Sequence, residues 1–315
     1  MCARHSPGRW RCAVSGARRW VRPLGLAISF ACLAWVISRF ASDASWRTVL
    51  ADTGHGRFFA HVAVGMTVYA SGVLVLGFAW ASLQRAFAAT GFSARPVSTY
   101  LVTQIGKYLP GNVAQYVGRH LLLRRAGLGH VPLLACAFAE TLSLGVAACL
   151  FAARFAGRWA PAFSAPLVAS LAIVIFAGTI LAASVVHRRW PWLSSRLPVL
   201  EPGWLVAALA LHLLFFVLMG TTLLCIAMTT VAAQDRLAAL PAMAAVAATS
   251  WMAGYVVPGA PAGLGVREAV LIALMAQLQP GADGLVLAAG FRVATFGGDV
   301  LAFMLAWTWR WKQGA

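Results

Sequence analysis

Charged residues are scarce in this chain of 315 residues. Only 10% of its residues are Asp, Glu, Lys or Arg, against about a quarter in an ordinary soluble domain. Hydrophobic residues make up 61%. A water-soluble fold of this length cannot bury that much apolar surface, so most of the chain must be surrounded by lipid. The composition predicts an all-α, polytopic integral membrane protein with about six to eight transmembrane helices.

Acidic residues and lysines are the rarest charges. The chain has 8 acidic residues, and its only lysines are Lys107 and Lys312, so arginine supplies most of the net charge of +17. The arginines cluster between apolar runs, as expected for loops on the cytoplasmic side of a membrane. Because no soluble basic domain is available to bind a phosphate backbone, nucleic acid is not an expected partner.

Common metal and catalytic motifs are also missing. The six cysteines form no CxxC or His-paired spacing, so we expect no disulfide, metal or other cofactor. The sequence contains no GxxxxGK[ST], no HExxH and no Ser-His-Asp arrangement, which argues against an ATP-driven pump and against an enzyme. The Gly-rich segment 259–265 fits a Pro-broken turn better than a phosphate loop. His212, in the middle of an apolar run, is expected to be packed and hydrogen-bonded rather than a metal ligand.

The apolar runs define one membrane domain. Residues 1–23 are rich in arginine and lack acidic residues, and we expect them to be a cytoplasmic N-terminal segment. A single transmembrane domain is expected over residues 24–310, followed by a short tail at 311–315. Plain spans are expected at residues 24–40, 58–80, 131–153, 163–186, 204–230 and 285–309. With both termini cytoplasmic, this arrangement suits the plasma membrane, the inner membrane of a bacterium.

Two further apolar segments, 97–123 and 237–278, are interrupted by Pro-Gly pairs. In each, a Tyr precedes the break and an Arg follows at the same spacing: Pro110 and Arg119, then Pro258 and Arg267. A break and a charge are both costly in such surroundings. We expect the first segment to be a re-entrant hairpin from the cytoplasmic side. The second is either a hairpin from the opposite side or two short spans, and opposed hairpins favour an inverted repeat with a site between its halves.

Charges inside the apolar segments are the candidate site residues, because an ionised side chain at the bilayer centre costs at least about 2.5–3.5 kcal/mol. A helix that restarts after a Pro-Gly pair exposes free backbone N–H groups, which favour an anion. The spacing of Asn112, Gln115 and Arg119 places them on one helix face. The candidates for binding an anionic headgroup are therefore Arg119, Arg267, Arg292, Gly111, Asn112, Gln115 and Gly259.

Three acidic residues lie in the same segments: Glu140, Glu268 and Asp299. They are expected to balance the arginines, to contact a cationic headgroup or to carry a coupling proton. Arg292 is expected to pair with Asp299 or with Glu268. The alternative interpretation is that all these charges form buried ion pairs that only hold helices together.

The two broken segments resemble a known family. The motifs that carry the resemblance are Lys107-Tyr-Leu-Pro-Gly-Asn-Val with Tyr116-Val-Gly-Arg119, and Pro258-Gly with Gly263-Leu-Gly-Val-Arg-Glu268. They are similar to the membrane region of the lysylphosphatidylglycerol synthase/flippase family, over roughly residues 24–310. The resemblance implies a helical domain with re-entrant segments that moves lipids or lipid-linked sugars between leaflets. The best-known members carry a C-terminal aminoacyl-transfer domain, whereas this chain stops at Ala315, so lysyl-lipid synthesis is not expected.

The leading functional hypothesis is flippase-like translocation of an anionic or zwitterionic phospholipid or lipid-linked amphiphile through an Arg-lined cavity. Its partners would be membrane lipids. One alternative is a transferase acting on lipid phosphates or lipid-linked sugars with Glu268 or Asp299 as base, although no loop is long enough to build a donor site. Another is an accessory subunit of a separately encoded synthase or glycosyltransferase.

Overall fold

The computed structural model describes residue 38 and residues 55–88, 94–109, 113–159, 164–197, 200–229, 235–257, 261–279 and 283–312. These residues form helices and no strand, so the prediction of an all-α fold is confirmed. Apart from Ser38, the expected first span at 24–40 lies outside them. Six helices are long and apolar enough to cross a membrane. They are α3 (His55–Ala88), α6 (His130–Ala152), α8 (Ala165–Arg189), α10 (Pro202–Ile226), α11 (Arg236–Val256) and α13 (Gly284–Lys312). The protein is therefore a multi-pass membrane protein.

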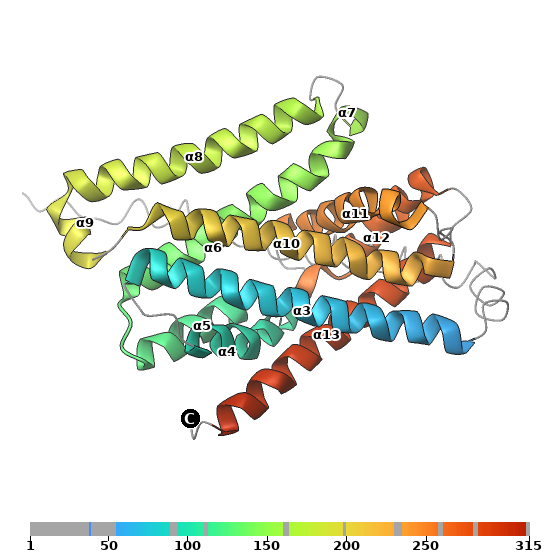
Figure 1. Ribbon diagram of the computed structural model, residues 1–315, viewed down its shortest axis with the longest axis horizontal. Coiled ribbons are helices and arrows are strands. Elements are labelled where there is room, and N and C mark those ends of the chain that lie inside the picture. The colour runs from blue at the N-terminus through green and yellow to red at the C-terminus, as the bar shows by residue number, and fades with distance from the viewer. Residues whose placement is uncertain are drawn as a thin grey trace, which may run out of the picture.

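The spanning helices pack unequally. Helix α3 contacts α10, α13 and α6, and α10 also contacts α11, so these helices make the centre of the bundle. Helix α8 lies along one side and packs mainly on α6 (Figure 1). Only 11% of its apolar window is buried, against 44–56% in the other five. The short helices α7 (Ala156–Trp159) and α9 (Pro191–Arg196) lie at the two ends of α8. Helix α8 is therefore peripheral to the centre.

The first broken segment is a helical hairpin. Its arms are α4 (Ala94–Gln104), which continues into the 3₁₀ turn η1 (Ile105–Tyr108), and α5 (Ala114–Arg125). The arms pack against each other and have 11 and 12 residues. Since about 20 residues are needed to cross a bilayer, neither arm is a span.

The second broken segment is a hairpin with unequal arms. Helix α11 has 21 residues, whereas α12 (Val266–Leu278) has 13. The 3₁₀ turn η5 (Pro261–Gly263) precedes α12. Two short spans therefore do not describe this segment, because one arm is of full length and the other is too short.

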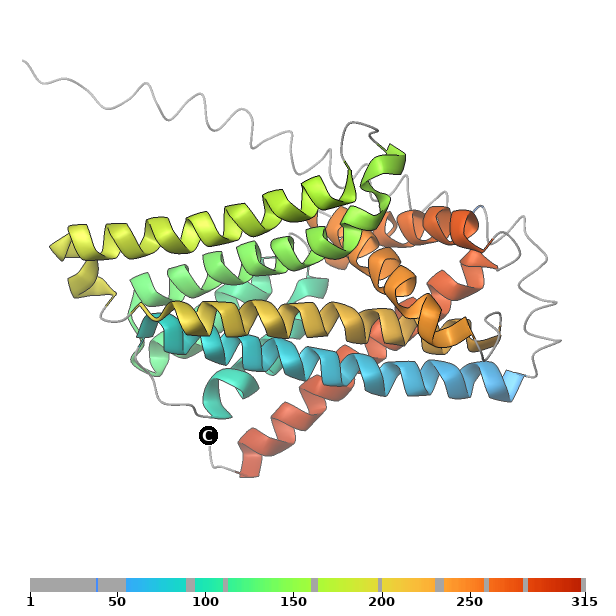
Figure 2. The same ribbon diagram turned by 45° about the horizontal axis from the view of Figure 1, so that its top comes forward.

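The hairpins come from opposite ends of the bundle, which is one of the two arrangements expected from the sequence. Helices α4 and α5 lie at the end where α3 finishes, and α11 and α12 lie at the other end (Figures 1 and 2). The turns η1 and η5 contact each other. The two interruptions, far apart in sequence, thus meet inside the bundle.

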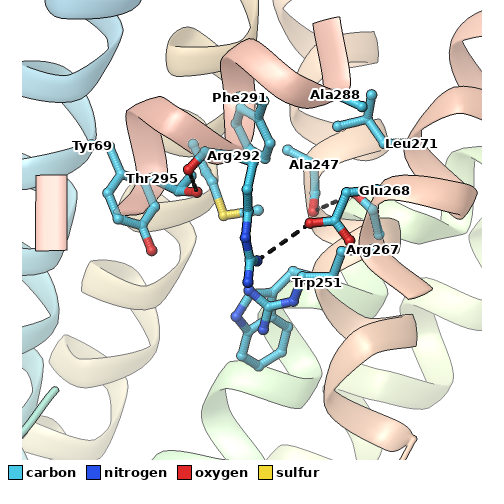
Figure 3. Close-up of a pocket in the computed structure, with 12 residues that line it drawn as sticks. Tyr69, Ala247, Trp251, Arg267, Glu268, Leu271, Ala288, Phe291, Arg292 and Thr295 are labelled. Atoms are coloured by element: carbon cyan, nitrogen blue, oxygen red, sulfur yellow. Dashed lines mark hydrogen bonds and ion pairs between the residues drawn. The ribbon is translucent and has the colours of Figure 1, made fainter. Parts of the chain in front are cut away.

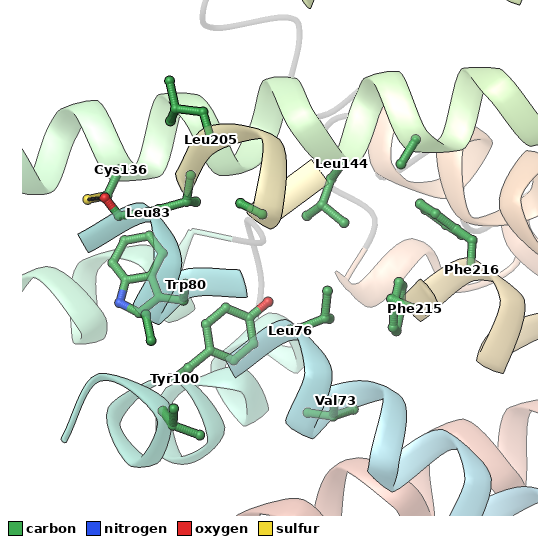
Figure 4. Close-up of a cluster of buried hydrophobic side chains, with 14 of the residues drawn as sticks. Val73, Leu76, Trp80, Leu83, Tyr100, Cys136, Leu144, Leu205, Phe215 and Phe216 are labelled. Atoms are coloured by element: carbon green, nitrogen blue, oxygen red, sulfur yellow. Dashed lines mark hydrogen bonds between the residues drawn. The ribbon is translucent and has the colours of Figure 1, made fainter. Parts of the chain in front are cut away.

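A core of large apolar side chains surrounds this meeting point. Helix α3 contributes Val73, Leu76 and Trp80, which face Tyr100 of α4 and Phe215 of α10 (Figure 4). Close backbone contacts tighten the packing. A Cβ atom added to Gly220 of α10 would lie only 2.5 Å from the Cα of Ala244 on α11. Such contacts fix the helices closely enough to hold charged side chains in defined positions.

Candidate functional site

The first charged pair joins the two helices that follow the first break. Arg119 of α5 donates from Nη1 to Oε2 of Glu140 on α6 at 2.7 Å, and each side chain is 2% exposed. The guanidinium carbon lies 3.9 Å from the centre of the Tyr100 ring and 4.5 Å from that of Trp80. Its charge is therefore balanced by a carboxylate and by two aromatic faces.

The second pair fixes the tip of the first hairpin to the last helix. Lys107 of η1 lies 2.7 Å from Oδ2 of Asp299 on α13. The hydroxyl of Tyr108 donates to the same oxygen at 2.6 Å, and Lys107 also donates to the Tyr69 hydroxyl at 3.3 Å. The Asp299 side chain is fully buried. Two neighbouring residues of one turn thus share a single buried carboxylate.

The third pair lies beside the second hairpin. Nη1 of Arg292 on α13 lies 3.4 Å from Oε1 of Glu268 on α12 (Figure 3). The same nitrogen donates to the backbone carbonyl of Ala262 in η5 at 3.4 Å. These side chains are 22% and 13% exposed. The third pair is longer and less buried than the other two.

Arg267 differs from these arginines because it has no ion-pair partner within the described part of the chain. Its Nε is buried without a hydrogen-bond acceptor there. The side chain passes between the backbones of Gly254 and Gly263, where an added Cβ atom would lie 2.4 Å and 2.6 Å from the arginine. Its guanidinium carbon is 5.9 Å from the centre of the Trp251 ring (Figure 3). The fold thus makes a slot for a cation, and no carboxylate of the described residues lies within ion-pair distance of it.

Two small cavities meet at Arg267. The first, the α13 cavity, is lined by Glu268, Arg292 and Thr295 (Figure 3). The second, the α5 cavity, is lined by residues of the first hairpin, including Gln115 and Arg119. Both cavities share Tyr69, Trp251 and Arg267. The volumes open to the centres of water molecules are about 20 and 40 Å³. Each has room for only one to a few waters in this conformation, since one water needs roughly 10–15 Å³.

An apolar groove on the outside of the bundle adjoins the α5 cavity. This α5–α6 groove has an open volume of about 290 Å³, and its outer wall includes the exposed side chains of Val117, Leu121 and Leu134. Its inner wall includes Tyr116 and Arg119, which also line the α5 cavity. A polar interior and an apolar exterior are therefore separated by these two side chains.

A pair of tyrosines connects the two hairpins. The hydroxyls of Tyr116 on α5 and Tyr255 on α11 lie 3.2 Å apart. Tyr255 stacks on Trp251 with ring centres 4.9 Å apart, and its hydroxyl lies 3.4 Å from that of Thr141. The α5 cavity is closed on this side by aromatic rings that belong to both hairpins.

The structure changes the expected anion sites at the breaks. Gly111, Asn112 and Gly259 lie outside the described residues. Helix α5 begins at Ala114, so of the predicted helix face only Gln115 and Arg119 lie on it, and both are buried. Helix α12 begins at Val266, because Gly263 and Gly265 have φ angles of +69° and +81° that keep the chain out of the helix.

The expected free N-terminus of the second restarted helix is also occupied. The backbone N–H of Gly265 donates to Oε2 of Glu268 at 2.7 Å. The protein's own carboxylate therefore takes the position that an external anion was expected to fill. The ion pair of Arg292 is with Glu268, the second of its two expected partners, because Asp299 is held by Lys107.

Several site residues were not among the sequence candidates. Lys107, Tyr108, Tyr69, Trp251 and Tyr255 all line the cavities or bind the charged groups. Lys107 offered a signal, since it is one of only two lysines and belongs to the first motif. Tyr108 and Tyr255 also offered one, because a Tyr precedes each break. Tyr69 and Trp251 offered none, because an aromatic side chain in a span is most often ordinary core.

His212 is not part of the site. It is buried, and its Nδ1 lies 2.7 Å from the Ser143 hydroxyl. Within the described residues, no three His, Cys, Asp or Glu side chains are grouped as metal ligands.

No protein-family model matches this sequence, and no curated protein matches it. The fold and the site themselves define the class: a multi-pass helical membrane protein with a buried cluster of ion pairs and one additional arginine.

Proposed function

We propose that this protein moves a phospholipid or a lipid-linked amphiphile between the leaflets of a bilayer, in the manner of a flippase. One observation carries the proposal. Two opposed hairpins meet around two cavities that share an arginine with no counter-ion among the described residues, in the interior of an apolar bundle. Burying a charge in such a position is costly, and charges inside a membrane domain usually bind a ligand or line a passage.

The α5–α6 groove favours an amphiphile over a soluble solute. A lipid tail would lie along its apolar outer wall, which faces the surroundings of the bundle. The headgroup would reach the α5 cavity past Tyr116 and Arg119, the two residues that the groove and the cavity share. A polar headgroup would thus pass through protein while its tails remain in lipid.

Translocation by this route requires the hairpin tips to separate. The present cavities have room for a few waters but not for a headgroup, so the conformation is closed. Opening toward the groove would break the contact between Tyr116 and Tyr255. Opening along the bundle would loosen the attachment of Lys107 and Tyr108 to Asp299. These polar contacts are candidates for the two gates of an alternating-access cycle.

The distribution of arginines supports a cytoplasmic location for the end of the bundle at which α3 finishes. Among the described residues, seven arginines and one glutamate lie in the helix ends and connections there: Arg85, Arg95, Arg124, Arg125, Arg188, Arg189, Arg196 and Glu201. The opposite end carries four arginines and two aspartates: Arg57, Arg154, Arg158, Arg236, Asp235 and Asp283. We therefore propose the plasma membrane, a bacterial inner membrane, with both termini cytoplasmic. Helix α13 runs toward this cytoplasmic end (Figure 1).

The test is lipid translocation by the purified full chain in phosphatidylcholine vesicles. Lipids labelled on an acyl chain with a fluorophore are placed in both leaflets, and the fraction that an external reductant can bleach is followed with time. We expect movement by the wild type, and a loss of at least tenfold in Arg267→Gln. Arg57→Gln, an exposed arginine at the start of α3, is the matched control and should leave the rate unchanged. Equal rates in wild type and Arg267→Gln would contradict the assigned site. A wild type that moves no lipid would contradict the function and favour an accessory subunit.

A further inference from the structure

The buried charges of the site do not cancel. Within the described part of the chain, four cations face three carboxylates: Lys107, Arg119, Arg267 and Arg292 against Asp299, Glu140 and Glu268. The sum is 4 − 3 = +1. The undescribed residues at the two tips, 110–112 and 258–260, are Pro-Gly-Asn and Pro-Gly-Ala and carry no charge. The surplus therefore belongs to Arg267, the only one of the four without a carboxylate in the described chain.

We propose that the site takes one phosphodiester monoanion, and that it selects lipids whose headgroup carries a single negative charge. This inference rests on the proposed function and narrows its substrate class. A buried charge is stabilised when a ligand supplies the missing opposite charge. A guanidinium matches a phosphate with two parallel hydrogen bonds. The position of Arg267 on both cavities makes it available to a headgroup from either side.

A zwitterionic headgroup fits this site poorly. Its ammonium group would need a carboxylate, and each of the three carboxylates already has its own cation. Asp299 and Glu140 are 2.7 Å from their partners and almost completely buried, and Glu268 is 3.4 Å from Arg292. Freeing one of them leaves another cation unpaired, so the zwitterion gains nothing from its positive charge.

A dianionic headgroup would need a second unpaired cation. The ion pair that is easiest to open is that of Glu268 with Arg292, because it is the longest and the most exposed of the three. Glu268→Gln removes one negative charge and frees Arg292, which raises the surplus to +2. The amide oxygen of Gln can still accept from the Gly265 N–H, so this variant keeps the start of α12 intact.

The experiment measures equilibrium binding of short-chain lipids to the purified full chain in a neutral detergent at pH 8. The probes are phosphatidylglycerol, a phosphodiester monoanion, phosphatidylcholine, a zwitterion, and phosphatidate, a phosphomonoester. We expect the wild type to bind phosphatidylglycerol at least tenfold more tightly than the other two. Arg267→Gln should lose this preference, and Glu268→Gln should shift the ratio of phosphatidate to phosphatidylglycerol affinity upward at least tenfold. Arg267→Lys keeps the charge and should keep the preference at lower affinity. Arg57→Gln should match the wild type.

Equal affinity for phosphatidylglycerol and phosphatidylcholine in the wild type would overturn the inference, as would an unchanged ratio in Glu268→Gln. The lipid-translocation assay in vesicles tests the proposed function independently of these binding measurements. If all three lipids move at one rate, the function stands and the charge selection falls. If phosphatidylglycerol binds selectively but no lipid moves, the charge selection stands and the proposed transport function is contradicted. Soluble glycerophosphoglycerol tests whether the ligand is a free anion rather than a lipid. If it displaces bound phosphatidylglycerol as well as phosphatidylglycerol itself does at the same concentration, the site serves a water-soluble phosphodiester, and the lipid selection is overturned.

Discussion

Replacing Arg119 by Met should destabilise the protein strongly, whereas the same replacement of Arg267 should change its stability little. Arg119→Met leaves the carboxylate of Glu140 buried, 2% exposed, with no cation beside it. Removing one partner of such a pair costs about 3–5 kcal/mol. The contacts of the guanidinium with the Tyr100 and Trp80 rings, worth roughly 1 kcal/mol each, are lost as well. Arg267→Met leaves no charged side chain without its partner, so it should change the free energy of unfolding by no more than about 1 kcal/mol.

Thermal unfolding of the two purified variants in one detergent measures this difference. A loss of 3–5 kcal/mol lowers the midpoint by on the order of 10 °C in a chain of this size, whereas Arg267→Met should unfold within a few degrees of the wild type. The double variant Arg119→Met/Glu140→Leu removes both charges and should recover most of the loss. Equal midpoints for the two single variants would refute the assignment of Arg119 to a closed ion pair and of Arg267 to an open site. So would a double variant that is no more stable than Arg119→Met.

Three further predictions follow from the same contacts. Asp299→Asn should cost about 3–5 kcal/mol, because it leaves a buried ammonium without its counter-ion; thermal unfolding measures this, and an unchanged midpoint would contradict the pairing. Gly254→Ala should cost about 1–3 kcal/mol and lower lipid transport at least tenfold by displacing Arg267, whereas Gly178→Ala, at an open position, should do neither. Burial and the neighbouring histidine and arginine lower the pKa of His120, which lies outside the six spanning helices. The unfolded chain therefore binds the proton more readily, and stability should fall as pH drops below about 6.5. His120→Gln should flatten this fall in the unfolding midpoint between pH 7 and 5.

The spans could be predicted well wherever hydropathy alone decides them. Residues 131–153 were predicted where α6 covers His130–Ala152, because the run is apolar apart from Glu140, Thr141 and Ser143. The end of α3 was set too early, at residue 80 instead of Ala88. Ser82 and Gln84 look like the start of a loop, yet both are buried. Helix α3 packs against α4 of the first hairpin and against α6, and a hydropathy profile contains no information about such neighbours.

The candidate site could be predicted as a set of charges but not as a set of pairs. Lys107 and Asp299 are 192 positions apart, and they meet only because the tip of the first hairpin lies against α13. The prediction of a vacant helix N-terminus after Pro258 was wrong for a local reason. Three residues with positive φ, Ala262, Gly263 and Gly265, delay α12 until Val266, and this brings Glu268 to the position that caps it.

The slot around Arg267 also constrains which sequences can share this site. The arginine fits only because positions 254 and 263 carry no Cβ atom, and Gly263 in addition adopts a left-handed backbone. A homologue that keeps the arginine must keep both glycines, and one that loses either glycine must place a smaller residue at 267. These three positions, which lie on both sides of the break, should therefore vary together in evolution.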